Sequence, residues 1–161
     1  MIGILSDSHD NITALETAVD FFNDEKVELV LHAGDVVSPF MAKTLSKLDC
    51  PFKISFGNND GDRITLQKRT SEVGGTAEDF IDIVYRKKRI GMVHGTNQAI
   101  VGALIRSDIF DIVISGHTHT PLVNRTKTLH INPGEVSGVL TGKKTVALLD
   151  QDELRAEIIT L

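Results

Sequence analysis

Hydrophobic positions in the first two thirds of the chain alternate between short apolar runs and stretches with helical spacing. Residues 2–6 form an apolar run of strand length. The segment that follows has apolar residues three or four positions apart, at Ile12, Leu15, Ala18, Val19 and Phe22. Because Asn11 stands just before this periodic stretch, it is a candidate helix cap. The pattern therefore predicts a strand followed by a helix.

The same alternation continues toward residue 115. It predicts, in chain order, a strand over 28–33, a helix over 40–48, a strand over 52–56, a strand over 89–94, a helix over 97–106 and a strand over 111–115. Strands that alternate with helices form βαβ units with parallel strands. Beyond Leu122, short runs of Val, Ile, Leu and Thr are separated by turn signals, which favours antiparallel strands in a second sheet. We therefore predict one α/β domain over 1–161, with two sheets inside and helices outside.

Composition narrows the functional classes. The chain has 161 residues, of which 41% are hydrophobic, as expected for one globular domain with an ordinary core. Its net charge of -5 argues against strong binding of nucleic acid through phosphates. The single cysteine, the lack of a signal-like start and the lack of an apolar run of roughly 20 residues predict a cytoplasmic protein without membrane contact.

Candidate metal ligands occur in five short blocks. Each block lies at or just past the C-terminal end of a predicted strand, where active sites gather in open α/β sheets. The seven candidates are Asp7, His9, Asp35, Asn58, His94, His117 and His119. Glycines next to these ligands, at positions 34, 57, 95 and 116, allow tight turns and close backbone approach to a buried ion. The spacing therefore predicts a metal site at this edge.

The types of donor narrow the choice of metal. Four imidazoles, two carboxylates and one amide oxygen, without a thiolate, suit Mn, Fe, Ni, Zn or Co better than Ca or Mg. So many donors are sufficient for two divalent ions. With both carboxylates and one hydroxide counted, such a cluster carries a net charge of roughly +1, which attracts an anionic phosphoester.

The order of the blocks resembles a known family. D-x-H, GD, GNxD, HG and GHxH, in that order over residues 7–119, resemble the motifs of the calcineurin-like metallophosphoesterases. The short chain with INPGE at 131–135 is similar to the small stand-alone phosphodiesterases of archaea and bacteria within that superfamily. The resemblance implies a four-layer αββα sandwich, built from two mixed β-sheets flanked by helices. It also implies two divalent ions, with Mn²⁺ as the foremost candidate and Ni²⁺, Fe²⁺, Zn²⁺ or Co²⁺ as the others.

The resemblance assigns a role to each ligand. The first metal would be held by Asp7, His9 and His119, the second by Asn58, His94 and His117, and Asp35 would bridge the two. A hydroxide shared by both ions would attack phosphorus in line with the leaving oxygen. We accordingly count Asp35, Asn58 and His117 as catalytic residues as well as ligands.

One position departs from the family pattern. Many members carry histidine after the GN of the fourth block, whereas this chain carries Asn59. An amide donates a hydrogen bond but cannot protonate a leaving group. We therefore expect better activity on aryl or nucleotide-type diesters than on alkyl monoesters or protein phosphates. Asn59 and Asn97 are predicted to contact the substrate, and for Asn97 a helix cap is the alternative role and the slightly favoured one.

Two other kinds of function stay open. A nucleotide phosphatase or a nuclease would use the same metal chemistry. A non-catalytic scaffold is the third possibility, because a retromer subunit with a similar fold works chiefly by binding partners. The complete ligand set favours an enzyme that acts on a small phosphoester. The family resemblance further implies a homodimer or homotetramer.

Other polar groups have structural explanations. His32 and His130 lie inside predicted strands, so we expect packed or hydrogen-bonded histidines rather than ligands. The basic run over 86–89 sits between two predicted strands, which favours a solvated hairpin. The sequence Asn-Pro-Gly over 132–134 is a turn signal, and its placement near the metals is implied by the family resemblance alone.

Overall fold

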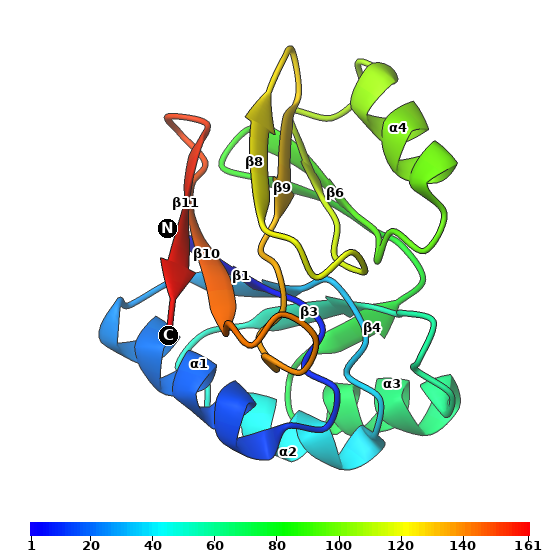
Figure 1. The fold of residues 1–161 in the computed structure, drawn as a ribbon, viewed down its shortest axis with the longest axis vertical. Helices are drawn as coiled ribbons and strands as arrows, with labels where there is room; N and C mark the ends of the chain where they lie inside the picture. Colours follow the sequence, from blue (N-terminus) through cyan, green and yellow to red (C-terminus); the bar gives the residue numbers. More distant parts are fainter.

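The computed structural model describes residues 1–161 as four layers, with helices outside two facing β-sheets (Figure 1). The first sheet has the strand order β11-β10-β1-β2-β3-β4, and the second has β5-β6-β7-β9-β8. The strands are β1 (Ile2–Leu5), β2 (Leu29–His32), β3 (Phe52–Ser55), β4 (Thr76–Glu78), β5 (Ile81–Tyr85), β6 (Lys88–Met92), β7 (Ile112–Ile114), β8 (Leu122–Arg125), β9 (Leu129–Asn132), β10 (Thr145–Asp150) and β11 (Arg155–Thr160). Both sheets combine parallel and antiparallel pairs, as predicted.

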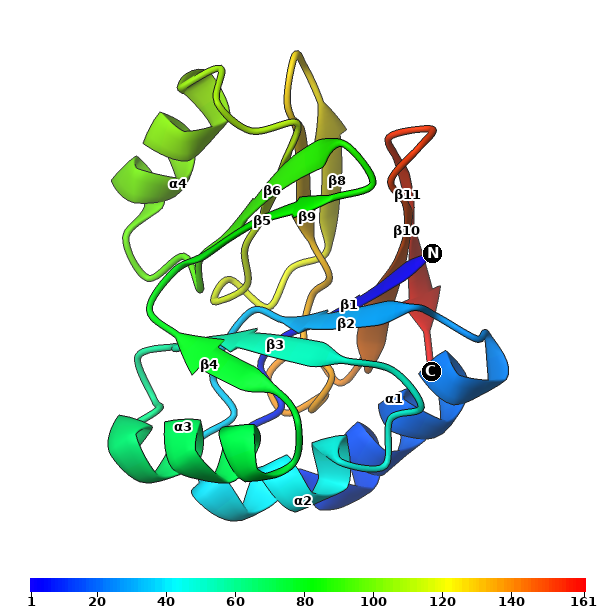
Figure 2. The ribbon, with the colours of Figure 1, turned by 180° about the vertical axis from the view of Figure 1, so that it is seen from behind.

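Three helices cover the first sheet and one covers the second (Figure 2). They are α1 (Ile12–Asp24), α2 (Ala42–Leu45), α3 (Arg63–Glu72) and α4 (Gln98–Arg106). Ile2 and Ile4 of β1 belong to the apolar core between the sheets, whereas Leu5 packs with the α1 side. Because both faces of β1 are buried, its sequence is apolar throughout.

Helix α1 follows the predicted pattern except at its first residue. Asn11 caps it, with its side-chain oxygen accepting a hydrogen bond from the backbone N of Ala14 at 3.1 Å. The buried face of the helix comprises Ala14, Leu15, Ala18, Val19 and Phe22. Ile12 was expected on this face but is 43% exposed, because it occupies the first position, before the helix packs on the sheet.

Two elements were not predicted from the sequence, and one was predicted too long. Helix α3 buries only Leu66 and Thr70, so it carries almost no apolar periodicity. Strand β4 has three residues and begins at Thr76, shortly after α3 ends at Glu72. The helix expected over 40–48 is a 3₁₀ turn at Pro39–Met41 followed by the four residues of α2.

The C-terminal strands were assigned to the wrong sheet in part. Strands β8 and β9 do join the second sheet, but β10 pairs antiparallel with β1 in the first, where Ile2 faces Leu149. Strand β9 also runs parallel to β7. Strand β10 buries Val146 against the α1 layer and Ala147 between the sheets. The apolar pattern of β10 therefore predicted that the strand is buried, but it did not predict which sheet the strand joins.

The basic run over 86–89 is a hairpin, as predicted. Arg86 and Lys87 form its turn with positive φ angles of 45° and 69°, and the turn joins β5 to β6. Arg86 pairs with the exposed carboxylate of Glu28. Elsewhere, no helix is both long and apolar enough to cross a bilayer.

Parallel pairing places the functional loops side by side. Strands β1, β2 and β3 are parallel neighbours, and so are β6, β7 and β9 in the other sheet. The carboxyl ends of each set therefore meet at one edge of their sheet. The loops that follow five of these six strands carry the predicted ligand blocks.

Candidate metal centre

The predicted ligands lie in loops with unusual backbone conformations. Positive φ angles occur at five of the seven candidates: Asp7 (56°), His9 (43°), Asp35 (58°), His117 (68°) and His119 (57°). For residues with a Cβ this left-handed region costs about 1 kcal/mol each, and such strain clusters at functional sites. The surrounding contacts must therefore hold these loops in place.

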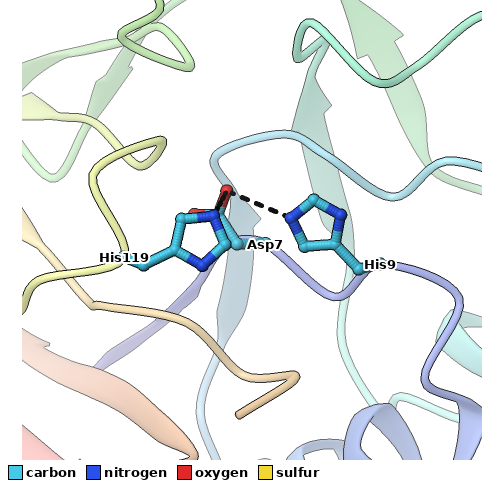
Figure 3. Close-up of side chains that lie close together, drawn as sticks. All are labelled: Asp7, His9 and His119. Carbon is cyan, nitrogen blue, oxygen red and sulfur yellow. Dashed lines mark ion pairs between the residues drawn. The ribbon is translucent and has the colours of Figure 1, made fainter. Parts of the chain in front are cut away.

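One group of ligand atoms centres on Asp7 (Figure 3). The Oδ1 atom of Asp7 is 3.8 Å from Nε2 of His9 and 3.4 Å from Nε2 of His119. The two imidazole rings are stacked, with centroids 5.2 Å apart. These three side chains offer ligand atoms within 4.8 Å of one another, which is close enough to share one ion. They are the set that the family resemblance implies for the first metal.

A second group converges on Asp35. Nε2 of His94 lies 3.3 Å from Oδ2 of Asp35, and Nε2 of His9 lies 3.7 Å from the same oxygen. Asp7, Asp35 and His94 again offer atoms within 4.8 Å of one another. Asp35 thus lies between ligands of both groups, as a bridging carboxylate must.

The remaining two candidates border this second group. The side-chain oxygen of Asn58 is 3.1 Å from Nε2 of His94. The ring of His117 meets that of His94 edge-on, with centroids 5.2 Å apart, and the backbone N of His117 donates to Oδ2 of Asp7 at 3.1 Å. The His117 ring does not belong to either converging set. All five blocks nevertheless meet in one site.

Unsatisfied polar atoms show that the site suits a cation. Asp7 is fully buried, and its Oδ1 atom has no hydrogen-bond partner; Nε2 of His9 has none either. Burial raises the pKa of Asp7, because the charged carboxylate has lost its water. Buried polar atoms are almost always paired, so two unpaired ligand atoms that face each other suit a cation shared between them.

Hydrogen bonds fix the tautomers of two histidines. Nδ1 of His94 lies 2.7 Å from the carbonyl of Ala33, and Nδ1 of His119 lies 2.9 Å from the carboxylate of Glu135. Both partners accept, so Nδ1 must donate in each ring. Nε2 is therefore the atom left to bind metal, which is the usual arrangement for a ligating histidine.

Proton and metal compete at the second group. Burial disfavours a charged His94, but the adjacent Asp35 carboxylate raises the pKa of His94 overall. Burial acts against Asp35 as well, yet hydrogen bonds from His94 and Asn59 lower the pKa of Asp35. A metal at this position would have to displace any proton from Nε2 of His94, because only the unprotonated nitrogen binds metal.

Asn59 and Asn97, both expected at the substrate, are also structural residues. The backbone N and the side-chain amide of Asn59 donate to the two carboxylate oxygens of Asp35, each at 2.8 Å. Asn59 therefore orients the candidate bridging ligand. Asn97 caps α4, accepting from the backbone N of Ala99 at 3.0 Å, which is the alternative role considered for it.

Asp60 is a site residue that the sequence did not single out. Its buried carboxylate accepts hydrogen bonds from the backbone N of Asp35, Val37 and Gly57, at 3.1, 2.7 and 2.6 Å. It joins two ligand loops from different strands. A Cβ at Gly57 would collide with the Asp35 side chain, so only glycine allows this approach. The signal was present in GNND, because Asp60 is the last residue of that block and the D of the GNxD motif.

Glu135 is the second residue that was missed. It is fully buried and follows β9, at the same edge as the ligand loops. Its carboxylate accepts from Nδ1 of His119, from the Ser137 hydroxyl, and from Leu140 and Thr141. Burial alone would raise its pKa, but these hydrogen bonds lower the pKa of Glu135 to about 2. Its place at a strand end within INPGE could have identified it.

The other histidines are structural, as predicted. His32 is fully buried: Nδ1 accepts from the backbone N of Gly34 at 3.2 Å, and Nε2 lies 3.0 Å from the hydroxyl of Ser8. Burial lowers the pKa of His32 to about 3. His130 lies 2.9 Å from the hydroxyl of Ser115, and burial lowers its pKa as well.

The Asn-Pro-Gly turn lies beside the site, as the family resemblance implied. The side-chain amide of Asn132 donates to the carbonyl of Gly116 at 2.8 Å and to the hydroxyl of Thr118 at 3.0 Å. It therefore braces the loop that carries His117 and His119.

Next to the candidate ligands lies an open cavity of about 300 Å³, lined by His9, Asn59, His119, Val139 and Leu140.

Fold and site together define a metallophosphoesterase. Residues 1–154 match the model of the calcineurin-like phosphoesterase superfamily domain, so the chain belongs to that superfamily. Phosphodiesterase MJ0936 of Methanocaldococcus jannaschii is 37% identical to it, over 99% of this chain and 98% of that protein. A probable metallophosphoesterase of Methanothermobacter thermautotrophicus is 33% identical, over 99% of this chain and 91% of its own length.

Solved structures agree with this assignment. The structure described as that of a novel archaeal phosphodiesterase is 37% identical and superposes with a TM-score of 0.96, covering 99% of both chains. Vps29 of Entamoeba histolytica, at 14% identity, superposes with a TM-score of 0.68 over 99% of this chain and 98% of its own. The likeness to Vps29 concerns the fold alone. The family and the fold predicted from the sequence are both confirmed.

The orphaned ligand atoms predict stabilisation by metal. Mn²⁺ at about 100 times its dissociation constant should stabilise the metal-stripped protein by about 2.7 kcal/mol, which raises the melting temperature by roughly 5–10 °C. Asp35→Asn should remove most of this increase. Asp108→Asn is a matched control, because Asp108 is exposed and has nearly the same positive φ, 59°. An equal increase in both variants, measured by differential scanning calorimetry, would contradict the assignment.

The buried neutral His32 predicts a pH-dependent stability. The unfolded chain binds a proton at His32 below about pH 6.5, whereas the folded chain does so only near 3. Stability is therefore lost as the pH falls through this window, by about 1.4 kcal/mol per pH unit from this residue. In urea denaturation at pH 7 and pH 5, the free-energy difference between wild type and His32→Asn should shrink by about 2 kcal/mol. A difference that stays constant with pH would exclude this effect.

Proposed function

We propose that this protein is a metal-dependent phosphodiesterase that hydrolyses aryl or nucleotide-type diesters. The observation that carries the proposal is the pair of orphaned, buried ligand atoms on Asp7 and His9, within a family of phosphoesterases. The relative at 37% identity is named a phosphodiesterase, which supports the reaction class. We further expect a small phosphoester substrate, a cytoplasmic location and a homodimer or homotetramer.

Seven side chains would hold two divalent ions, with Mn²⁺ as the foremost candidate. Asp7, His9 and His119 would bind one ion, and Asp35 would be shared between the two. The second ion would be bound by Asn58, His94 and His117. Bound there, such ions supply Lewis acidity toward the phosphoryl oxygens and lower the pKa of a water nucleophile.

The chain's own residues set the positions of the candidate ligands and decide which of these groups carry protons. Asp60 and Asn59 fix the backbone and the carboxylate of Asp35. Glu135 keeps the proton of His119 on Nδ1 and so directs Nε2 into the site. The cavity lining has no carboxylic acid, its two imidazoles are assigned to metal binding, and Asn59 cannot give up a proton. We therefore expect the leaving group to depart with little protonation, which favours acidic alcohols such as phenols.

A comparison of two aryl substrates tests the function. Metal-stripped protein should be inactive, and added Mn²⁺ should restore hydrolysis of bis(4-nitrophenyl) phosphate faster than that of 4-nitrophenyl phosphate. Asp35→Asn should lower kcat by about 100-fold or more, because it removes a charge between the two ion sites. Asp108→Asn should retain full activity. A lack of turnover with Mn²⁺, Ni²⁺, Fe²⁺, Zn²⁺ and Co²⁺ would instead support a binding scaffold.

The missing proton donor predicts a steep dependence on the leaving group. For a series of aryl methyl phosphates, the wild-type rate should fall sharply as the pKa of the leaving phenol rises. Asn59→His should flatten this slope, because an imidazolium at that position can protonate the departing oxygen. For the diester with the least acidic phenol, the variant should be faster than the wild type by about tenfold or more. An unchanged slope in the variant would show that position 59 does not face the leaving group.

A further inference from the structure

Two apolar side chains stand exposed at the rim of the metal centre. Val139 and Leu140 are adjacent in sequence, and both are apolar side chains with high exposure, at 64% and 72%. Both line the cavity of about 300 Å³ that His9, Asn59 and His119 also line. The apolar pair and the candidate metal ligands therefore face the same space.

The loop that carries the pair is held firmly. Glu135 accepts hydrogen bonds from the backbone N of both Leu140 and Thr141, and from the Thr141 hydroxyl at 2.7 Å. The backbone N of Gly142 donates to the carbonyl of Gly138 at 3.2 Å and closes the loop. Exposed apolar groups on a fixed backbone lose little entropy when they bind a partner.

The base of this loop is attached to the metal centre itself. The backbone N of Ser137 donates to the carbonyl of Asp7 at 3.2 Å. Glu135 binds His119 and the 138–142 loop with the same carboxylate. The position of Val139 and Leu140 relative to the ligands is thus fixed by contacts that also position two ligands.

The cavity lining carries no lysine or arginine. A phosphate bound by the metals would be neutralised there, but a second anionic group beside it would find no cationic side chain in this cavity. An uncharged, apolar substituent would instead remove exposed carbon surface of Val139 and Leu140 from water.

We infer that Val139 and Leu140 form a subsite for one apolar, uncharged esterifying group of the substrate. This inference rests on the proposed phosphodiesterase function and narrows it. The substrate class is a phosphodiester with a single negative charge and at least one aryl or similarly apolar group. Diesters whose substituents are small, or carry further phosphates, are poorer ligands of this subsite.

Binding of two matched diesters tests the subsite without relying on turnover. Diphenyl phosphate and dimethyl phosphate have the same charge and differ chiefly in apolar surface, and their leaving groups, phenol and methanol, are far less acidic than 4-nitrophenol. In calorimetric titrations, the Mn²⁺-loaded wild type should bind diphenyl phosphate about tenfold more tightly. The double variant Val139→Ser/Leu140→Ser should lose this preference and keep its affinity for dimethyl phosphate. Its melting temperature should not fall, because both side chains are exposed.

Val84→Ser is the control, because Val84 is 70% exposed on β5, the edge strand of the second sheet opposite β8. It should bind both diesters as the wild type does. Equal affinity of the wild type for the two diesters, or an unchanged preference in the double variant, would overturn the subsite. If the preference follows the prediction while no diester is hydrolysed with any metal, the subsite stands and the proposed function fails.

Discussion

Two carboxylates buried among imidazoles are the constraint on which the site depends. Asp7 and Asp35 are almost completely inaccessible to water, and burial of a carboxylate is costly unless positive charge compensates it. Amide donors from Asn59 compensate the Asp35 carboxylate in part, whereas Oδ1 of Asp7 has no hydrogen-bond partner. Divalent cations satisfy the same atoms more completely, so the fold is built for metal.

Residues other than the candidate ligands stabilise the strained ligand loops. Left-handed backbone at most ligands would relax if the loops were free. Asp60 ties the loops after β2 and β3 together through three backbone amides, and Glu135 ties the loop after β7 to the loop after β9. Glycines at 57 and 116 let backbones approach where any side chain would collide. These residues are therefore as necessary to the site as the ligands.

The proposed substrate preference, in contrast, depends on groups other than the candidate ligands. Asn59 lines the cavity beside the candidate ligands, and it provides only an amide, which cannot protonate a leaving group. The apolar pair Val139 and Leu140, which lines the same cavity, would add a second preference, for a substrate group with apolar surface over a charged one. Under the proposed function, both features favour singly charged diesters with apolar substituents, and neither depends on which metal is bound.

Sequence by itself determined the strands and identified the candidate ligands that follow them. Apolar runs of strand length and metal-binding side chains just past them are local signals, so β1, β2, β3, β6 and β7 and the five blocks were all readable. Helix α3 could not be predicted from the sequence, because it buries only two side chains and so has no apolar periodicity. The capping role of Asn97 was foreseen as an alternative, since it needs only neighbours in the chain.

Only the tertiary structure decided which distant segments meet. Strand β10 could have extended either sheet, and pairing with β1 depends on the whole packed core rather than on its own pattern. The roles of Asp60 and Glu135 and the place of Val139 and Leu140 follow from hydrogen bonds and contacts between loops far apart in sequence. A linear pattern shows which side chains are able to bind metal. Their supporting carboxylates and the shape of the cavity arise when the two sheets close on each other.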